Sequence, residues 1–192
     1  ELSQSAFQPA GFEVAFGKDG NMPAISIPGG KMEARLRGFV DRVDTWQEGS
    51  GSFVRVTDYK TGQKSFDYCD VSQGVGLQML LYLFALEKEG SVLLGSDAAC
   101  AGVEYFPARA PYLPADGPMT AEEIQKERGK KWVRSGLFLR EERVLEAMEP
   151  ENPETRLPVN RKKDGSLSGS LASTAQFRAL EGYVFHLLAD MV

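Results

Sequence analysis

Apolar and polar positions alternate along much of the first half of the chain, which is the period of β-strands with one buried face. Short alternating runs at 12–16 and 23–27, separated by a glycine-containing turn, predict the start of an antiparallel sheet. Two longer runs, 31–46 and 53–60, are joined by a loop of glycine and serine. They predict a hairpin of unusually long strands.

Helical periodicity appears after this hairpin. Residues 75–86 carry apolar side chains on nearly every side, which predicts a helix that is buried all round rather than an amphipathic one. We expect it to be the central helix of the fold. A further strand is predicted over residues 100–106, where a proline follows and ends it.

The second half of the chain is predicted to be mainly helical. Thr120 and Glu123 fit a capping box ahead of a charged helix at about 121–133. A short helix is predicted at 141–148. A last helix is predicted at about 175–191, where a serine and a threonine are available as its cap.

Length and composition suit one folded unit, because the chain has 192 residues of which 42% are hydrophobic. We expect a single domain over 1–192, with a core at about 31–110 and a helical part at about 119–192. The polar stretch 149–171 is predicted to be loop-rich and is the one linker candidate. The chain starts at Glu1 rather than at methionine, so we expect a fragment of a longer protein. It shows no secretory signal and no apolar run near the roughly 18 residues of a membrane span.

The net charge of −5 argues against a surface that is uniformly basic for binding nucleic acid. Lysine and arginine nevertheless outnumber glutamate within 126–143. This segment could follow a DNA backbone, although a solvated helix face with i,i+4 ion pairs is the favoured interpretation. Residues 161–163 could likewise contact phosphate or only keep a loop soluble.

Several conspicuous side chains are interpreted as structural. Cys69 and Cys100 lack the spacing of metal ligands and are predicted to be small buried side chains in a reducing compartment. His186 is predicted to be a structural histidine. Three aromatic residues could stack on unpaired bases, although full or partial burial is favoured for them: Trp46, Trp132 and Tyr112.

A charged pair stands out in the run 53–60. Alternation places Asp58 and Lys60 on the same face as two valines, where charged groups are costly unless they are paired or bound. The hairpin can bring Asp41 beside Asp58. Two converging carboxylates need a cation, and their oxygens favour Mg²⁺ or Mn²⁺, which also bind substrate phosphate. Lys60 could then orient or help deprotonate the attacking water, or stabilise phosphate charge.

Simple alternation does not point Asp41 cleanly toward the core, because it shares a strand face with arginine as well as apolar residues. A bulge near Gly38, or a strand start that is exposed on one side, would explain the pattern. The alternative to a site is a surface Asp–Lys pair on an edge strand. The spacing of Gln78 and Tyr82 favours a site, since i,i+4 puts both on one stripe of a buried helix, where polar groups need partners.

Taken together, these residues resemble the RecB-type nuclease signature of the PD-(D/E)XK superfamily. The matching segments are Gly38-Phe-Val-Asp-Arg-Val-Asp44, Val56-Thr-Asp-Tyr-Lys-Thr-Gly62 and Gly76-Leu-Gln-Met-Leu-Leu-Tyr82. Their joint order and spacing make the resemblance specific. Residues 12–17, 102–109 and 135–139 are also similar to the nuclease domains of bacterial helicase–nucleases that process double-strand DNA ends.

The resemblance implies an α/β fold of the restriction-endonuclease type, with a central mixed β-sheet flanked by helices. It implies Mg²⁺ or Mn²⁺ held by Asp41, Asp58 and the backbone carbonyl of Tyr59. Lys60 would be the catalytic lysine, and the other two residues would form an accessory pair near the substrate phosphate. The implied catalytic residues are Asp41, Asp58, Lys60, Gln78 and Tyr82.

The resemblance also implies a Mg²⁺-dependent DNA exonuclease domain of the bacterial cytoplasm, to which a helicase–nuclease A subunit feeds a DNA strand end. In the helicase–nuclease subunit that these segments resemble, the nuclease domain carries four cysteines for an iron–sulfur cluster. Cys69 and Cys100 match none of their positions, so we expect the cluster ligands outside this chain. The alternatives are a non-catalytic DNA-binding or subunit-docking module with a nuclease fold, and a stand-alone exonuclease. The intact set of Asp41, Asp58 and Lys60 favours catalysis.

Overall fold

The computed structural model describes residues 4–28, 33–62, 64–109, 112–113, 117–150 and 153–191, with the backbone alone at 28, 130, 131 and 155. Its centre is a six-stranded sheet in the order β1-β4-β5-β6-β7-β10. These strands are β1 (Gln8–Phe16), β4 (Gly38–Glu48), β5 (Gly51–Lys60), β6 (Ala99–Pro107), β7 (Ser135–Leu139) and β10 (Leu171–Ala172). Parallel and antiparallel pairs both occur, which confirms the predicted α/β class with a mixed sheet.

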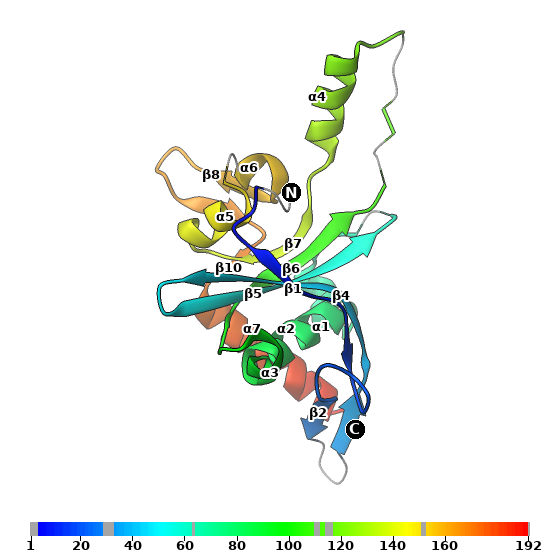
Figure 1. Ribbon diagram of the computed structural model, residues 1–192, viewed down its shortest axis with the longest axis vertical. Helices are drawn as coiled ribbons and strands as arrows, with labels where there is room; N and C mark the ends of the chain where they lie inside the picture. The colour runs from blue at the N-terminus through cyan, green and yellow to red at the C-terminus, as the bar shows by residue number, and fades with distance from the viewer. Residues whose placement is uncertain are drawn as a thin grey trace.

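Two layers cover the sheet, one on each face (Figure 1). The layer below it in this view contains α1 (Tyr68–Ser72), α2 (Gln78–Glu89), α3 (Ser91–Leu94) and α7 (Thr174–Ala189). The layer above it contains α5 (Glu142–Met148), α6 (Pro153–Arg156) and a hairpin of β8 (Val159–Arg161) and β9 (Leu167–Gly169). The sheet is therefore covered on both faces, and charged groups on its strands must be paired or reach an edge.

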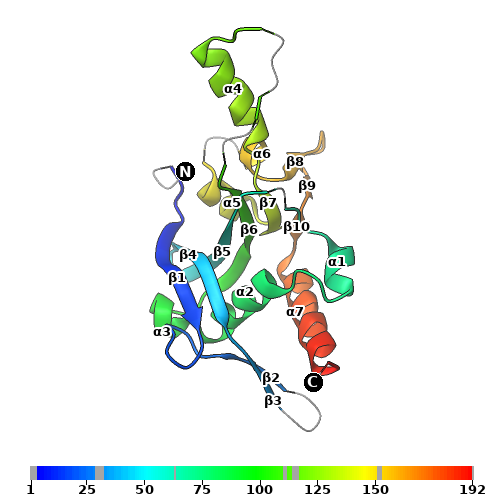
Figure 2. The same ribbon diagram turned by 90° about the vertical axis from the view of Figure 1, so that its right-hand side faces the viewer.

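One helix stands apart from both layers. It is α4 (Ala121–Lys131), which projects on an arm between β6 and β7 (Figures 1 and 2). The predicted capping box is present, because the Glu123 backbone N–H donates to the Thr120 hydroxyl at 3.2 Å and the Glu123 carboxylate accepts from the Thr120 backbone N–H at 2.8 Å. The arm leaves the sheet at the end where β5 and β6 finish.

The predicted central helix is confirmed as α2, but it begins at Gln78 rather than at residue 75. Gly74 and Gly76 have φ angles of 78° and 71°, a left-handed conformation that glycine tolerates and a right-handed helix excludes. From Gln78 the helix packs against β5 and β6. Its buried residues are Met79, Leu80, Leu81, Tyr82, Leu83, Phe84 and Leu86.

One expectation about the first strands is confirmed and another is wrong. The runs at 12–16 and 23–27 do form strands, but β1 pairs with β4, while β2 (Ile25–Pro28) pairs with β3 (Glu33–Leu36). The single strand expected over 31–46 is divided into β3 and β4 at Arg37, and its first two residues lie outside the described ranges. The hairpin of β4 and β5 is confirmed.

The C-terminal part contains more strand than the sequence predicts. The helices at 141–148 and 175–191 are confirmed as α5 and α7, and Ser173 is the N-cap of α7. The stretch 149–171, expected to be loop, contains α6 and the β8–β9 hairpin and runs into β10. Strands of two or three residues are too short to show a period, and β10 exists because it pairs with the distant β7.

Two of the structural side chains differ from expectation. Cys100 is buried as predicted, but Cys69 is exposed on α1. His186 is an exposed side chain on α7, with its Nε2 3.6 Å from an oxygen of Asp190. Trp46 is half-buried against the core, as predicted. Within the described ranges, no helix combines the length and apolar character that crossing a bilayer demands.

Candidate active site

The hairpin brings the two candidate metal-binding carboxylates to facing positions. Arg42 pairs with Thr57 in the antiparallel ladder, so Asp41 and Asp58 occupy the next opposing positions. Cβ atoms at such positions are typically about 4.5–5.5 Å apart. The Tyr59 backbone N–H donates a hydrogen bond to Asp41 Oδ2 at 2.8 Å, which ties this carboxylate to the strand that carries Asp58.

The start of β4 is exposed on one side, which is one of the two explanations that the sequence pattern allowed. Phe39 is 68% exposed, and Asp41 is half-buried. The other explanation, a bulge near Gly38, is wrong, because the β1–β4 register shifts only between Pro9 and Gly11. Glu13, opposite Asp41 in this register, has a φ of 49°, so β1 is irregular where it passes the site.

Lys60 and Asp58 form an ion pair at the end of β5. Lys60 Nζ lies 2.5 Å from Asp58 Oδ2, and the two side chains are 42% and 19% exposed. Lys60 also lines a cleft of about 550 Å³ that we call the strand-end cleft. Residues that line the cleft include Lys60, Lys64, Tyr105, Pro107, Val133 and Ser135. The candidate catalytic lysine therefore faces a space that a ligand can enter.

Tyr105 reports on the electrostatics of this cleft. Burial, followed by the charges of Asp58 and Asp70, raises the pKa of Tyr105 to about 12. At neutral pH the Tyr105 phenol stays protonated and can donate a hydrogen bond.

Gln78 and Tyr82 contact each other, as their spacing predicts. Gln78 Nε2 donates to the Tyr82 hydroxyl at 2.9 Å, and the Tyr82 ring stacks on Phe16 with centroids 4.9 Å apart. A Cβ added to Gly38 would lie 1.9 Å from the Tyr82 hydroxyl, so only glycine fits there. Among the described residues, neither Gln78 nor Tyr82 hydrogen-bonds to the charged side chains of the hairpin.

The opposite face of the same strands carries a buried ionic network that the sequence pattern did not reveal. Arg42 and Arg55 both contact Asp44, with Arg42 Nε to Oδ1 at 2.9 Å and Arg55 Nη2 to Oδ2 at 2.6 Å. Arg42 Nη1 also donates to the Tyr59 hydroxyl at 2.5 Å. The charged members of the network are Arg42, Asp44, Arg55, Glu104, Arg134 and Glu149.

Glu104 on β6 is the centre of this network and is fully buried. Thr57 Oγ1 donates to its Oε2 at 3.1 Å, and Arg134 Nη1 lies 3.2 Å from its Oε1. Burial alone would raise the pKa of Glu104, but the charges of Arg55, Arg134 and Arg42 together outweigh burial and lower it. The carboxylate is therefore ionised and satisfied by protein groups. Strand alternation could have found the network, because its arginines lie on the face opposite Asp58.

The candidate metal site offers two carboxylates. The described residues contain no group of three or more His, Cys, Asp or Glu side chains that could hold a metal ion. Two carboxylates suit Mg²⁺, because it keeps several waters and takes substrate phosphate oxygens as further ligands. Asp58 Oδ2 is buried and accepts no well-aligned hydrogen bond from the described residues, its contact being the Lys60 ion pair. This donor set fits a hydrated Mg²⁺ or Mn²⁺ rather than an ion enclosed by protein ligands.

The basic segment 126–143 does not form one surface. Lys126 and Arg128 are exposed on α4, whereas Arg134 is buried in the ionic network and Arg143 is paired with two glutamates. The side chains at 130 and 131 lie outside the described part of the chain. Arg140 and the paired Arg143 are exposed too, but they lie after β7 and on α5. The described cations of this segment are therefore spread over separate elements and do not form one continuous track for a DNA backbone.

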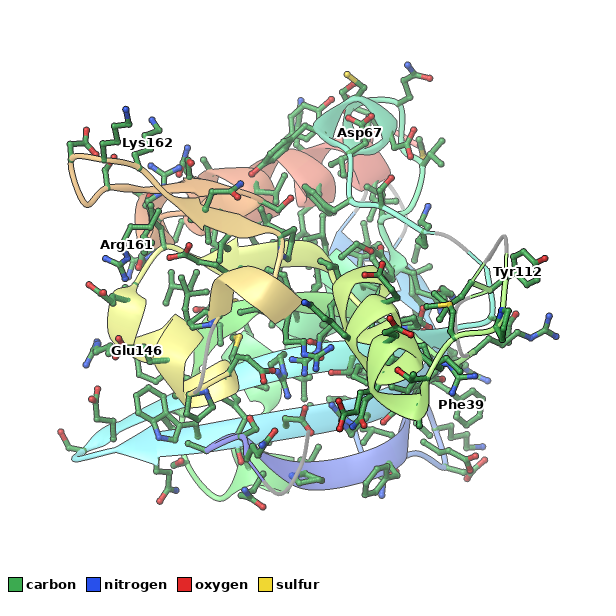
Figure 3. All side chains as sticks on the ribbon, turned by 90° about the horizontal axis from the view of Figure 1, so that it is seen from above. Phe39, Asp67, Tyr112, Glu146, Arg161 and Lys162 are labelled. Atoms are coloured by element: carbon green, nitrogen blue, oxygen red, sulfur yellow. The ribbon has the colours of Figure 1, made fainter. Side chains whose placement is uncertain are left out.

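The other candidate DNA contacts lie on different sides of the molecule. Figure 3 shows Phe39 and Tyr112 on one side, with Arg161 and Lys162 on the other. Arg161 is paired with Glu142 and Glu154. Two aromatic residues for which the sequence favours burial are exposed: Trp132 at 41% and Tyr112 at 84%. The Lys162 hairpin is thus far from the end of the sheet where the arm begins.

Comparison with known proteins gives the family. Residues 1–192 match the PD-(D/E)XK nuclease superfamily. The chain is 35% identical over 195 residues to the B subunit of the ATP-dependent helicase/deoxyribonuclease of Acetivibrio thermocellus and 37% identical over 194 residues to that of Bacillus mycoides. These alignments cover 99% and 95% of this chain but 17% and 16% of the relatives, so the chain spans only a small part of their length. The chain belongs to the PD-(D/E)XK nuclease superfamily.

Proposed function

We propose that this chain is the metal-dependent exonuclease domain of a bacterial helicase–nuclease that processes double-strand DNA ends for recombinational repair in the cytoplasm. Superfamily membership and the names of the relatives support a deoxyribonuclease. The observation that carries the proposal is the open face of the β4–β5 hairpin. Asp41 and Asp58 occupy opposing positions there, and Lys60 both pairs with Asp58 and lines the strand-end cleft.

Asp41, Asp58 and the Tyr59 carbonyl would hold a Mg²⁺ or Mn²⁺ ion. An ion bound there lowers the pKa of its water toward neutrality and shields phosphate charge. Lys60 would stabilise negative charge that develops on the phosphate, since its ammonium is at the cleft edge. The hydrogen bond from the Tyr59 backbone N–H keeps the Asp41 carboxylate in position.

Gln78 and Tyr82 would help to position the substrate rather than take part in breaking the bond. Gln78 is exposed at the first turn of α2 and can contact a substrate phosphate, while Tyr82 is buried. The Tyr82 hydroxyl accepts a hydrogen bond from Gln78, and its ring is fixed by Phe16. Tyr82 would therefore orient Gln78 rather than touch DNA.

The proposal extends to the longer protein of which the relatives are examples. Their names describe the B subunit of a helicase/deoxyribonuclease, so a partner A subunit with motor activity would deliver the strand to this domain. The iron–sulfur cluster implied by the family resemblance would have its ligands outside this chain, because Cys69 is on α1 and Cys100 is buried on β6.

The test is hydrolysis of a labelled single-stranded oligonucleotide in Mg²⁺ or Mn²⁺. We expect the chain to release short products, EDTA to stop the reaction, and Lys60→Ala and Asp58→Ala to lower its rate by about 100-fold or more. Lys18→Ala, an exposed lysine in the turn after β1, serves as the matched control and should keep the wild-type rate. Unchanged cleavage in Lys60→Ala would refute the assignment. Absence of both cleavage and metal binding in the wild type would support the docking module instead.

A further inference from the structure

The strand-end cleft opens directly beside the proposed catalytic lysine. Lys60 is part of the proposed cleavage site and also lines the cleft. The remaining lining residues come from the loop after β5, the end of β6 and the root of the arm. Its volume of about 550 Å³ is within the roughly 300–1,000 Å³ of small-ligand pockets. A DNA duplex, whose major groove alone is about 12 Å wide, is far too large to enter a cleft of this volume. The cleft therefore suits one unit of a single strand.

The second lysine of the cleft, Lys64, is held in place by its backbone. Its carbonyl oxygen accepts a hydrogen bond from the Ser135 hydroxyl at the root of the arm. Its Nζ lies 3.8 Å from the point where a Cβ of Gly76 would be, just ahead of Gln78 and α2. Lys64 thus lies between the cleft and the helix that presents Gln78.

The two lysines of the cleft differ in their partners. The Lys60 ammonium is paired with Asp58 at 2.5 Å. Among the described residues, no carboxylate lies within ion-pair distance of the half-buried Lys64. An ammonium that is not in an ion pair can bind an anion, and a phosphate oxygen is the anion that a nuclease substrate supplies.

We propose that the strand-end cleft holds the nucleotide next to the cleaved phosphodiester and that Lys64 binds the phosphate of that nucleotide. This inference rests on the proposed function, because it takes the neighbouring Asp41, Asp58 and Lys60 as the cleavage site. Lys64 is a substrate-binding residue here, whereas Lys60 acts on the phosphate that is cut. The Tyr105 phenol also lines the cleft and is a second hydrogen-bond donor for the same nucleotide.

The first experiment separates binding from turnover. In single-stranded oligonucleotide hydrolysis, Lys64→Gln should raise KM about 10-fold and change kcat less than about 2-fold, as expected for loss of one charged phosphate contact. The slope of log KM against log salt should fall by about 0.7, the single-strand value for one phosphate contact. The matched control Lys18→Gln should change neither quantity. An unchanged KM and salt slope in Lys64→Gln would overturn the proposal.

The second experiment identifies the phosphate. Two oligonucleotides are compared, one with a single uncharged methylphosphonate on the 5′ side of the cleaved linkage and one with it on the 3′ side. Each oligonucleotide is assayed with the wild type and with Lys64→Gln. At one of the two positions, removal of the phosphate charge should weaken binding to the wild type about 10-fold. The same oligonucleotide should weaken binding to Lys64→Gln by less than about a further 2-fold, because both changes remove the same contact. Additive losses at both positions would show that Lys64 does not contact either phosphate.

A binding assay distinguishes failure of this inference from failure of the proposed function. Fluorescence anisotropy of a labelled single strand in Ca²⁺ measures Kd without requiring turnover. If the wild type cleaves nothing but Lys64→Gln weakens binding about 10-fold with the lower salt slope, the nuclease proposal fails and the cleft assignment stands. If the wild type cleaves DNA and Lys64→Gln binds and cleaves like the wild type, the nuclease proposal stands and the cleft assignment fails.

Discussion

The two faces of the β4–β5 hairpin carry charged side chains in nearly the same numbers and use them in opposite ways. On one face, Asp41, Asp58 and Lys60 lie at the end of the sheet and reach solvent. On the other face, Arg42 and Arg55 are enclosed with carboxylates from β4 and β6. Alternate residues of one signature therefore build an open reactive site and a closed structural network.

The difference lies in how completely protein groups satisfy each charge. The Glu104 carboxylate has three arginines and a threonine around it, so no ligand is needed. Asp58 has one lysine, and its Oδ2 lacks a well-aligned hydrogen bond. Buried ion pairs often contribute little net stability, yet removal of one partner is strongly destabilising. An incompletely satisfied carboxylate is instead available to a cation.

The largest expected effect is on the open face. Lys60→Ala should lower the rate of DNA hydrolysis by about 10²–10⁴-fold, the range for loss of a positioned catalytic group. Its free energy of unfolding should change by less than about 0.5 kcal/mol, because the side chain is partly exposed. Rate measurements and urea denaturation of the same preparation check this. A large loss of stability would place Lys60 in the structural network instead.

The closed face should show the opposite behaviour. Glu104→Gln leaves three arginines around a neutral side chain, and we expect it to lower the free energy of unfolding by about 3–5 kcal/mol. For a domain of this size the melting temperature should then fall by roughly 6–20 °C. Glu146→Gln, on the exposed side of α5, is the control and should melt with the wild type. Equal melting of Glu104→Gln and wild type would show that the network is dispensable.

A smaller effect is expected at the contact between β4 and α2. Gly38→Ala places a methyl group 1.9 Å from the Tyr82 hydroxyl and should destabilise the fold by about 1–3 kcal/mol through overpacking. Tyr82→Phe removes the clashing oxygen, leaving Cζ as the nearest ring atom at 3.1 Å. The double variant should therefore be less destabilised than the sum of the single variants. Strict additivity in thermal denaturation would contradict this contact.

The smallest effect concerns pH. The pKa of Glu104 is lowered from its ordinary value of 4.5, so its ionisation stabilises the fold above that pH, and the contribution is lost as the pH falls through the lower native value. The stability difference between wild type and Glu104→Gln should be constant from pH 7 to about 5 and shrink below about 4.5. Urea titrations at each pH measure it. A difference that grows on acidification has the wrong sign for this account.

The sequence predicts the parts of the fold that carry a long run or a clear cap. The β4–β5 hairpin follows from long alternating runs, α2 from a long apolar run, and α4 and α7 from residues suited to cap a helix. The short strands β8, β9 and β10 do not, because pairing with distant segments defines them. The pairing of β1 with β4 rather than β2 is likewise a tertiary preference that no local pattern contains.

The residues of the candidate site are easier to predict from the sequence than the residues that support them. Strand alternation and helix spacing by themselves point to Asp58, Lys60, Gln78 and Tyr82. They do not identify Glu104 as the shared partner of Arg42 and Arg134, since these three residues are far apart in the chain. Nor do they identify Lys64, whose position depends on contacts with Ser135 and Gly76.

A calorimetric titration with Mn²⁺ tests the contrast between the two faces most directly, because metal binding does not require turnover. The wild-type chain and folded Glu104→Gln should bind Mn²⁺ with the same affinity, whereas Asp58→Asn should show no binding in the same concentration range. Wild-type affinity in Asp58→Asn, or no binding by the wild type, would contradict the assignment of the open face as the metal site.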